Sequence, residues 1–258
     1  MSFRDYFAPE WHGPPFALFG PGHLLSLALI AALALALTRL RGASEAARRR
    51  ARICLALTMA VGELSWHWWT LAFTGGWTLD RMLPLHMCTA LAWVGMYTLL
   101  SLNPISYEFV YFLGIGGSLQ AILTPDAGQY GLPHFRAVQT LVSHGLLIVC
   151  ALYLTIVEGL RPTWRSIPRV IVGTLVYMAF VSVVNVAVGG DYMFTLRKPP
   201  TASVLDRFGP WPWYLLPMIG LGILNCLVLY LPFVWLDRRR AADRFPTGDS
   251  LLPEPEIQ

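Results

Sequence analysis

A histidine and a cysteine lie close together near the start of an apolar run, in the segment Leu83-Pro84-Leu85-His86-Met87-Cys88-Thr89. A thiol attacks an ester once a base or a low local pKa makes it a thiolate, and histidine is a common base for that step. Ionisable groups inside a membrane segment are costly and are commonly functional. These residue types therefore predict either nucleophilic chemistry or a polar ligand site.

The spacing of the two side chains argues against a ready-made pair. Residues two apart on a regular helix point about 200° away from each other, so His86 and Cys88 should face different surroundings. The His86 face continues through Thr89 and aromatic residues, whereas the Cys88 face is apolar. Helical phase thus favours His86 for a polar interior and leaves Cys88 open between packing and chemistry. A distortion at Pro84 would bring both inward.

Further polar side chains fall at a similar depth of the apolar runs, at a rise of about 1.5 Å per residue. Glu63 and His67 are four residues apart and share a helix face, where an ionised pair would lower the cost of burying either one or would simply fix packing. His144 is a second candidate base. We expect one polar cavity toward the outer face, whose candidate members are Glu63, His67, His86, Cys88, Gln120, His144 and Asn185.

The elements that must position these residues are membrane helices. The chain of 258 residues is 55% hydrophobic and 13% charged, a composition that excludes an ordinary water-soluble domain. Runs of about 17 to 25 apolar residues predict an all-α, polytopic transmembrane helix bundle. Its seven expected spans are residues 22–38, 52–73, 83–101, 106–123, 134–157, 168–189 and 211–236.

Basic residues predict the orientation of this bundle. Thirteen of the 19 lysines and arginines follow the first, fifth and seventh spans, and short loops rich in them stay cytoplasmic. We therefore expect the N-terminus outside and the C-terminus in the cytoplasm. Residues 1–21 would form an outer interfacial segment, residues 22–236 the bundle and residues 237–258 a disordered cytoplasmic tail. The net charge of +4 is then explained by topology, and we expect no nucleic-acid partner.

Two expected outer loops add polar groups near the cavity mouth. Asp126 follows Leu123-Thr124-Pro125, where a helix-ending turn and a contact with substrate or metal are both open interpretations. Tyr192 lies in the segment from Gly189 to Pro210, which is long for a connection. That segment either gathers anionic headgroups through Arg197 and Lys198 or caps the bundle.

Several motifs together resemble the YwaF-like family of bacterial integral membrane proteins, over the region from about Gly62 to Tyr214. The segments that carry this resemblance are Leu83 to Cys88, Gly117 to Asp126, Ser143-His144-Gly145, Asn185 with Asp191-Tyr192-Met193, and Lys198-Pro199-Pro200. That family is more distantly similar to a mammalian transmembrane acyltransferase that moves acyl chains between phospholipids. The resemblance implies acyl transfer through a cysteine thioester, with Cys88 as nucleophile, His144 or His86 as base and Thr89 as an alternative nucleophile.

The leading hypothesis is therefore a lipid acyltransferase or acyl-ester hydrolase of the bacterial cytoplasmic membrane, with membrane phospholipids as partners and acyl donors. It needs no cofactor. Gln120 and Asn185 are plausible oxyanion donors, and Glu63, His67, Asp126 and Tyr192 complete the expected substrate site. One alternative is a transporter or receptor that binds a small polar ligand. Another is a metal-dependent hydrolase that uses His67, His86, His144 and Glu63.

Overall fold

The computed structural model describes residues 3–125, 129–199 and 204–244, and all regular elements in those residues are helical. The predicted all-α class is confirmed. The elements are α1 (Phe3–Phe7), α2 (Pro21–Thr38), the 3₁₀ turn η1 (Arg39–Gly42), α3 (Glu45–Trp69), the π-turn η2 (Thr70–Thr74), α4 (Met87–Ser101), α5 (Pro104–Phe109), the π-turn η3 (Val110–Gly114), α6 (Ile115–Leu123), α7 (Phe135–Ile156), α8 (Ser166–Val188), the 3₁₀ turns η4 (Tyr192–Phe194) and η5 (Val204–Arg207), and α9 (Leu215–Arg244).

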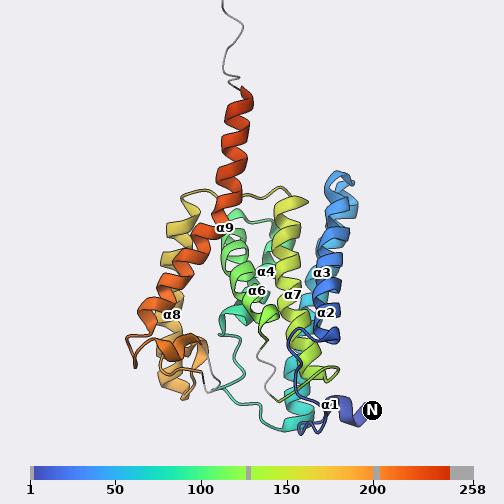
Figure 1. Ribbon diagram of the computed structural model, residues 1–258, viewed down its shortest axis with the longest axis vertical. Coiled ribbons are helices and arrows are strands. Elements are labelled where there is room, and N and C mark those ends of the chain that lie inside the picture. Colours follow the sequence, from blue (N-terminus) through green and yellow to red (C-terminus); the bar gives the residue numbers. More distant parts are fainter. Residues whose placement is uncertain (1–2, 126–128, 200–203, 245–258) are drawn as a thin grey trace, which may run out of the picture.

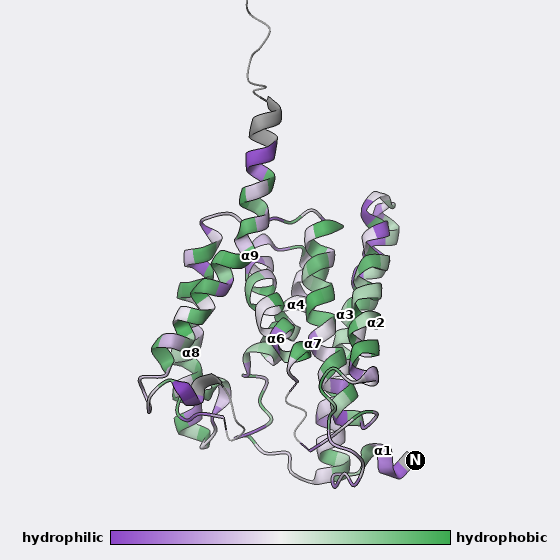
Figure 2. Ribbon diagram, in the orientation of Figure 1, coloured by the Kyte–Doolittle hydropathy of each residue, from purple (hydrophilic) through white to green (hydrophobic). Residues whose placement is uncertain are grey.

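Long helical segments fill the ranges in which we predicted membrane spans, with α5, η3 and α6 joined into one segment. Four regions are long and apolar enough to cross a membrane: Pro21–Gly42, Phe135–Ile156, Ser166–Val188 and Leu215–Arg239. Hydrophobic residues line these ribbons, and hydrophilic residues gather at the loops and at the end of α9 (Figure 2). A multi-pass membrane fold is thus supported, while the count of seven and the orientation stay predictions.

Helix α7 forms the centre of the bundle. It contacts α2, α3, α4 and α6. Of the residues in its most hydrophobic stretch, 67% are buried inside the bundle, against 17% for the corresponding stretches of α8 and α9. Helices α8 and α9 contact each other and lie to one side of the others in Figure 1. We call the end of the bundle that carries α1 and η4 the α1 end, and the opposite end, with the start of α3, the arginine-rich end.

Several helix boundaries differ from the sequence-based expectation; α3, for example, begins at Glu45 instead of residue 52. Helix α4 begins at Met87 instead of residue 83, because Pro84 lies in a turn and His86 occupies the N-cap in extended conformation. Helix α9 continues past residue 236 to Arg244. The segment before α2 is tied to the bundle, since the Trp69 indole donates to the Phe7 carbonyl (2.9 Å) and His134 Nε2 to the Ala8 carbonyl (2.9 Å).

The π-turn η3 explains a polar residue deep in α9. A π-turn disturbs the regular i→i−4 hydrogen bonds of its helix and can leave a carbonyl without a partner. The Asn225 amide donates to the Phe112 carbonyl at 2.9 Å, and it lies directly on the backbone of Gly116, where a Cβ would leave no room for it. Asn225 therefore joins α9 to the η3–α6 segment.

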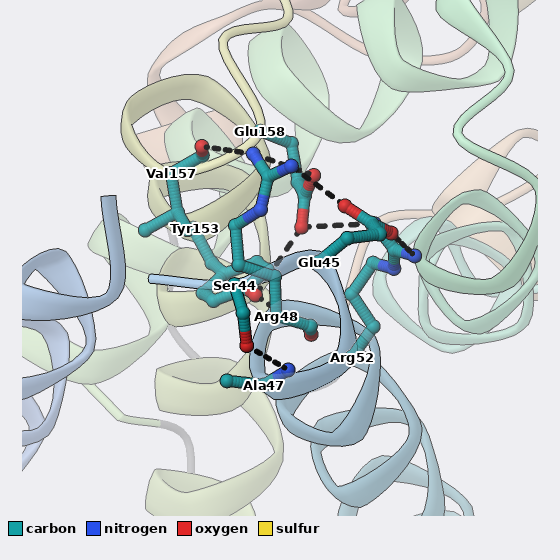
Figure 3. Close-up of polar contacts among 8 residues, drawn as sticks. All are labelled: Ser44, Glu45, Ala47, Arg48, Arg52, Tyr153, Val157 and Glu158. Carbon is teal, nitrogen blue, oxygen red and sulfur yellow. Dashed lines mark hydrogen bonds and ion pairs between the residues drawn. The ribbon is translucent and has the colours of Figure 1, made fainter. Parts of the chain in front are cut away.

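Paired charges hold the arginine-rich end together (Figure 3). Arg52 of α3 forms an ion pair with Glu158, just after α7, at 3.0 Å, and the two side chains are 8% and 3% exposed. Arg52 also binds Glu45 at 2.8 Å. The Tyr153 hydroxyl lies 2.9 Å from the Arg48 carbonyl and 3.2 Å from Glu158 Oε1, both of them acceptors. This network fixes the start of α3 against the end of α7.

A second ion pair at the same end joins α5 to α8. Arg169 Nη1 lies 2.6 Å and 2.7 Å from the two carboxylate oxygens of Glu108, and the Ser166 hydroxyl donates to the first of them at 2.8 Å. Glu108 is buried. A buried carboxylate needs such partners, because an isolated buried charge is strongly destabilising.

Candidate functional site

The start of α4 places the Cys88 thiol at the second residue of a helix with no side-chain cap. The first amide groups of a helix lack partners within the helix, and together they favour negative charge. The Cys88 side chain points toward α6: a Cβ built on Gly117 would lie 3.6 Å from its Sγ. All four cysteines are free thiols.

Glu63 of α3 is a buried acid near this thiol. It is 5% exposed, and its Oε1 has no hydrogen-bond partner among the described residues. Its carboxyl lies within electrostatic range of Cys88 and of Arg136. The expected pairing with His67 is not formed, because His67 turns to the loop after α3, where its Nδ1 accepts from the Trp77 indole at 3.0 Å.

His144 occupies the arc of α7 that faces the boundary between α4 and α6. Leu147, three residues further on, lies against Gly95 of α4, and Leu141, three residues earlier, packs with Ile122 of α6; His144 falls between those two faces. Its Nδ1 lies 2.8 Å from the Thr140 carbonyl. Because a carbonyl only accepts, Nδ1 donates, and the neutral ring keeps its lone pair on Nε2.

Ser118 is a member of this region that we did not single out from the sequence. It is 0% exposed, and its hydroxyl has no hydrogen-bond partner among the described residues. It lies one turn before Ile122, which packs with Leu141 and Ile148 of α7, and α6 and α7 contact each other. A serine within an otherwise apolar helix face was the available signal.

A chain of polar side chains along α7, from Arg136 through Gln139 to Ser143, was not predicted from the sequence. We call it the polar ladder. Arg136 stacks on the Trp66 ring at 3.6 Å and donates to the Gln139 side chain at 2.5 Å. Gln139 in turn donates to the Ser143 hydroxyl at 3.0 Å and the Gly62 carbonyl at 3.4 Å. The ladder crosses from α7 to α3 one residue from Glu63, so it orders the helix turn that carries that acid.

His86, which helical phase favoured for the polar interior, does not lie on the face of α4 as expected. It lies outside the helix, its ring is packed edge-on against Tyr192 at 5.2 Å, and its Nδ1 accepts from the Met193 amide at 3.3 Å. The structure thus places His86 beneath the η4 loop, while Cys88 faces α6.

Asn185 and Tyr192 hold that loop in place. The Asn185 amide donates to the Tyr192 carbonyl (2.9 Å) and the Thr195 hydroxyl (3.0 Å), and its oxygen accepts from the Tyr192 amide (2.8 Å). The Tyr192 hydroxyl donates to the Leu79 carbonyl at 2.7 Å and accepts from the Leu83 amide at 2.8 Å. Burial raises the pKa of this hydroxyl, which keeps its proton available for donation.

The remaining predicted site residues lie at the edge of the region. Thr89 is half-buried beside Cys88, Gln120 is exposed, and Asp126 lies outside the described residues. In the part of the chain that the structure describes, His, Cys, Asp and Glu side chains form no group of three or more that could hold a metal ion. His67, His86 and His144 accordingly have separate surroundings.

Residues 18–230 match the model of the TMEM164 family. The chain belongs to this family. A relative in Treponema pallidum (strain Nichols), described as an uncharacterized protein, is 28% identical over 151 residues, which is 58% of this chain and 62% of that protein. The match therefore covers less than two thirds of the relative's length. No solved structure matches the chain.

In this TMEM164-family protein, α3, α4, α6 and α7 supply an acid, a thiol, a hydroxyl and an imidazole; Glu63 and Ser118 are buried, and Cys88 and His144 are partly exposed. We call Glu63, Cys88, Ser118 and His144 the polar interior. Polar groups without partners in a packed interior are uncommon and call for an explanation. A thiol, a base with a free lone pair and unpaired helix-start amides together can carry out nucleophilic attack on a carbonyl.

Proposed function

We propose that this protein transfers or hydrolyses the acyl chain of a membrane phospholipid, with Cys88 as the nucleophile. The observation that carries the proposal is the Cys88 thiol at the uncapped start of α4, inside a region that also holds His144 and the unpartnered Glu63. The region lies within a bundle of membrane helices, so its substrate is expected to arrive from the bilayer. Family membership supports a membrane role but does not by itself specify the reaction.

The first step would form a thioester. Nε2 of His144 takes the thiol proton, and Sγ of Cys88 attacks the carbonyl carbon of the phospholipid ester. The carbon–oxygen ester bond then breaks, and the leaving lysophospholipid alkoxide takes the proton from His144. In the second step the hydroxyl of an acceptor lysophospholipid, or of water, gives its proton to His144 and attacks the thioester carbonyl. The carbon–sulfur bond breaks, and the leaving Cys88 thiolate takes the proton from His144.

The helix start supplies electrostatic stabilisation for this chemistry. The tetrahedral intermediate carries a negative oxygen, and backbone amides that point at such an oxygen lower the barrier. The amides of Cys88 and Thr89 are among the first of α4, where no side-chain cap competes for them. The buried Ser118 hydroxyl is a further donor at this level.

The cellular setting of the proposal follows from the basic residues. We propose seven spans in a bacterial cytoplasmic membrane, with the arginine-rich end in the cytoplasm and the α1 end outside. The polar interior would then lie in the outer half of the bilayer. Membrane phospholipids would be its substrates, and the reaction as written requires no cofactor.

Trapping of the thioester tests the proposal directly. The purified protein in phospholipid nanodiscs is incubated with radiolabelled phosphatidylcholine, and the peptide that contains Cys88 is examined for an acyl adduct released by hydroxylamine. We expect the adduct in the native protein and in Cys54→Ser, which removes an exposed thiol, and none in Cys88→Ser. An adduct on Thr89 that Thr89→Ala abolishes would transfer the nucleophile role to that residue. Unchanged acyl transfer in Cys88→Ser and Thr89→Ala would overturn the proposal.

A ligand-binding cavity without catalysis is the alternative use of the same residues. A transporter needs access from both sides of the membrane, whereas the polar interior lies toward the α1 end and the opposite end is closed by the Arg52–Glu158 pair. Labelling of single-cysteine variants with membrane-impermeant reagents separates the two. Reaction of residues along α7 from both sides would favour transport.

A further inference from the structure

A cleft separates α4 and the α5–η3 segment from α8. Its volume is about 450 Å³, within the roughly 300–1,000 Å³ of small-molecule sites. Its walls are mostly apolar, and the lining residues on which the argument rests are Met87, Ala90, Val94, Ile105, Phe109 and Thr174. The cleft belongs to neither the polar interior nor the charge networks.

The cleft follows the length of α4. It begins at Met87, the first residue of that helix, and reaches Asn103, just beyond its last residue; fifteen residues of α-helix span roughly 22 Å. The Tyr177 hydroxyl donates to the Leu85 carbonyl at 3.0 Å at one end. At the other end, the Ser106 hydroxyl accepts from Thr98 at 2.7 Å. Polar groups thus mark both ends of an apolar cleft.

The surroundings of the cleft are those of a membrane-facing surface. Val176 on α8 is 65% exposed and Leu100 on α4 is 62% exposed, and in the bilayer such side chains contact lipid. Helices α5 and α8 approach each other closely in the cleft, where Gly173 of α8 leaves room for the Phe109 ring of α5 and a Cβ would come within 2.6 Å of it. The cleft is thus open to hydrocarbon at the side and closed at its base.

The size of the cleft decides between a helix and a thinner occupant. An α-helix with its side chains is about 10–12 Å across, so even 10 Å of its length occupies roughly 800 Å³. That volume exceeds the 450 Å³ of the cleft. A helix of a second copy or of another protein therefore does not fit, whereas a flexible hydrocarbon chain does.

We infer that the cleft between α4, α5–η3 and α8 binds one acyl chain of a membrane glycerophospholipid. The carbonyl end of the chain lies at the Met87 end, one residue from Cys88, and its methyl end lies toward Asn103. This inference rests on the proposed function for the fate of the chain, because a chain bound in this direction brings its ester to the start of α4. It extends that function by naming the groove that selects the acyl chain.

Photo-crosslinking tests the cleft without any need for turnover. Phosphatidylcholine with a diazirine in one acyl chain is incorporated into nanodiscs that contain the Cys88→Ala protein, and the labelled peptides are identified by mass spectrometry. We expect label on the α4 segment from Met87 to Val94 and on the α8 segment around Thr174. Ala90→Phe fills the cleft and should lower this labelling about tenfold. Ala32→Phe adds the same ring at an exposed position of α2 and should leave the labelling unchanged.

Chain selectivity provides the second readout, in the protein with Cys88 intact. Ala90→Phe should lower transfer of palmitoyl chains relative to decanoyl chains about tenfold, and Ile105→Ala, at an exposed lining position, should shift the ratio toward longer chains. Equal labelling of all lipid-facing helices, or crosslinks between two protein copies at the cleft, would overturn the inference. Labelling confined to the cleft in a protein that shows no acyl transfer would support the binding site and count against the proposed function alone.

Discussion

The two ends of the bundle differ in how their buried carboxylates are bonded. At the arginine-rich end Arg52 has Glu158 and Glu45, and Glu108 has Arg169 and Ser166. In the polar interior the Glu63 Oε1 and the Ser118 hydroxyl have no partner among the described residues. The ion pairs of the first end join helices, although Arg48 Nε and Arg52 Nη1 there also lack a hydrogen-bond partner among the described residues. A buried carboxylate oxygen without such a partner inside a membrane bundle is a candidate for handling a substrate or a proton. The hydrogen-bond and ion-pair partners of these groups thus suggest which of them stabilise the fold and which are candidates for chemistry.

The largest expected effect concerns His144. We expect His144→Gln to lower acyl transfer by about a hundredfold or more, because the variant lacks the base for the thiol proton. Its melting temperature should change little. The control His12→Gln, at an exposed position, should keep full activity, measured as acyl exchange in nanodiscs. Full activity of His144→Gln would show that His144 is not the base, and His86 would then be the remaining candidate.

At the opposite end the expected effect is on stability. Arg52→Ala leaves Glu158 with only Arg48, at 3.7 Å, and the Tyr153 hydroxyl as partners. Removal of one member of a buried pair costs about 3 kcal/mol, and these two remaining contacts should reduce that loss. Thermal unfolding in detergent measures this loss, and acyl transfer per folded molecule should stay near the native value. An Arg52→Ala protein that is stable but inactive would show that the charge network takes part in the reaction. The distinction between a structural end and a reactive end would then be wrong.

Two serines form a matched pair of smaller effects. Ser118→Ala removes a buried hydroxyl that has no partner, so we expect unfolding free energy to stay the same or rise by up to about 1 kcal/mol, while acyl transfer falls. Ser166→Ala removes a hydroxyl that donates to Glu108 and should cost about 1 kcal/mol with activity retained. Equal losses of stability in both variants would show that Ser118 is bonded in the folded protein.

The smallest expected effect is the pH response of Glu45. The hydrogen bond from Arg52 lowers the pKa of this exposed carboxyl. A group whose pKa is lower in the folded state stabilises the fold above its unfolded pKa, and that contribution is lost as the pH falls through the folded pKa. Thermal unfolding from neutral to acidic pH should therefore show a slightly shallower decline for Glu45→Gln than for the native chain. Identical profiles would show that this outer member of the network contributes nothing measurable.

Much of the architecture was predictable from local patterns. Apolar runs of membrane length located the helices, because the bilayer requires about twenty apolar residues for each crossing. The start of α3 and the end of α9 lie seven and eight residues beyond the expected spans. The start of α4 was misplaced by four residues, from 83 to Met87. Composition alone did not show that the chain from Pro84 to His86 would form a turn fixed by Tyr192 and Tyr177.

The candidate site was predictable only in part. Depth along each helix placed both Glu63 and Cys88 in the outer half of their expected spans, since the rise per residue is fixed, and in the structure the two side chains interact electrostatically. The partner of His67 could not be predicted, because the Trp77 indole comes from a loop. Asn185 was expected to face a substrate, but its amide instead holds the loop at Tyr192.

The sequence by itself determined that this is an all-helical membrane protein with a thiol, an acid and histidines in its apolar runs, because hydrophobicity and helical rise are local properties. Only the tertiary structure decided which of these groups share an interior. The approach of α4 to Gly117 of α6 turns Cys88 inward, and the η4 loop takes up His86. Both depend on contacts between residues far apart in the chain, which no local pattern specifies.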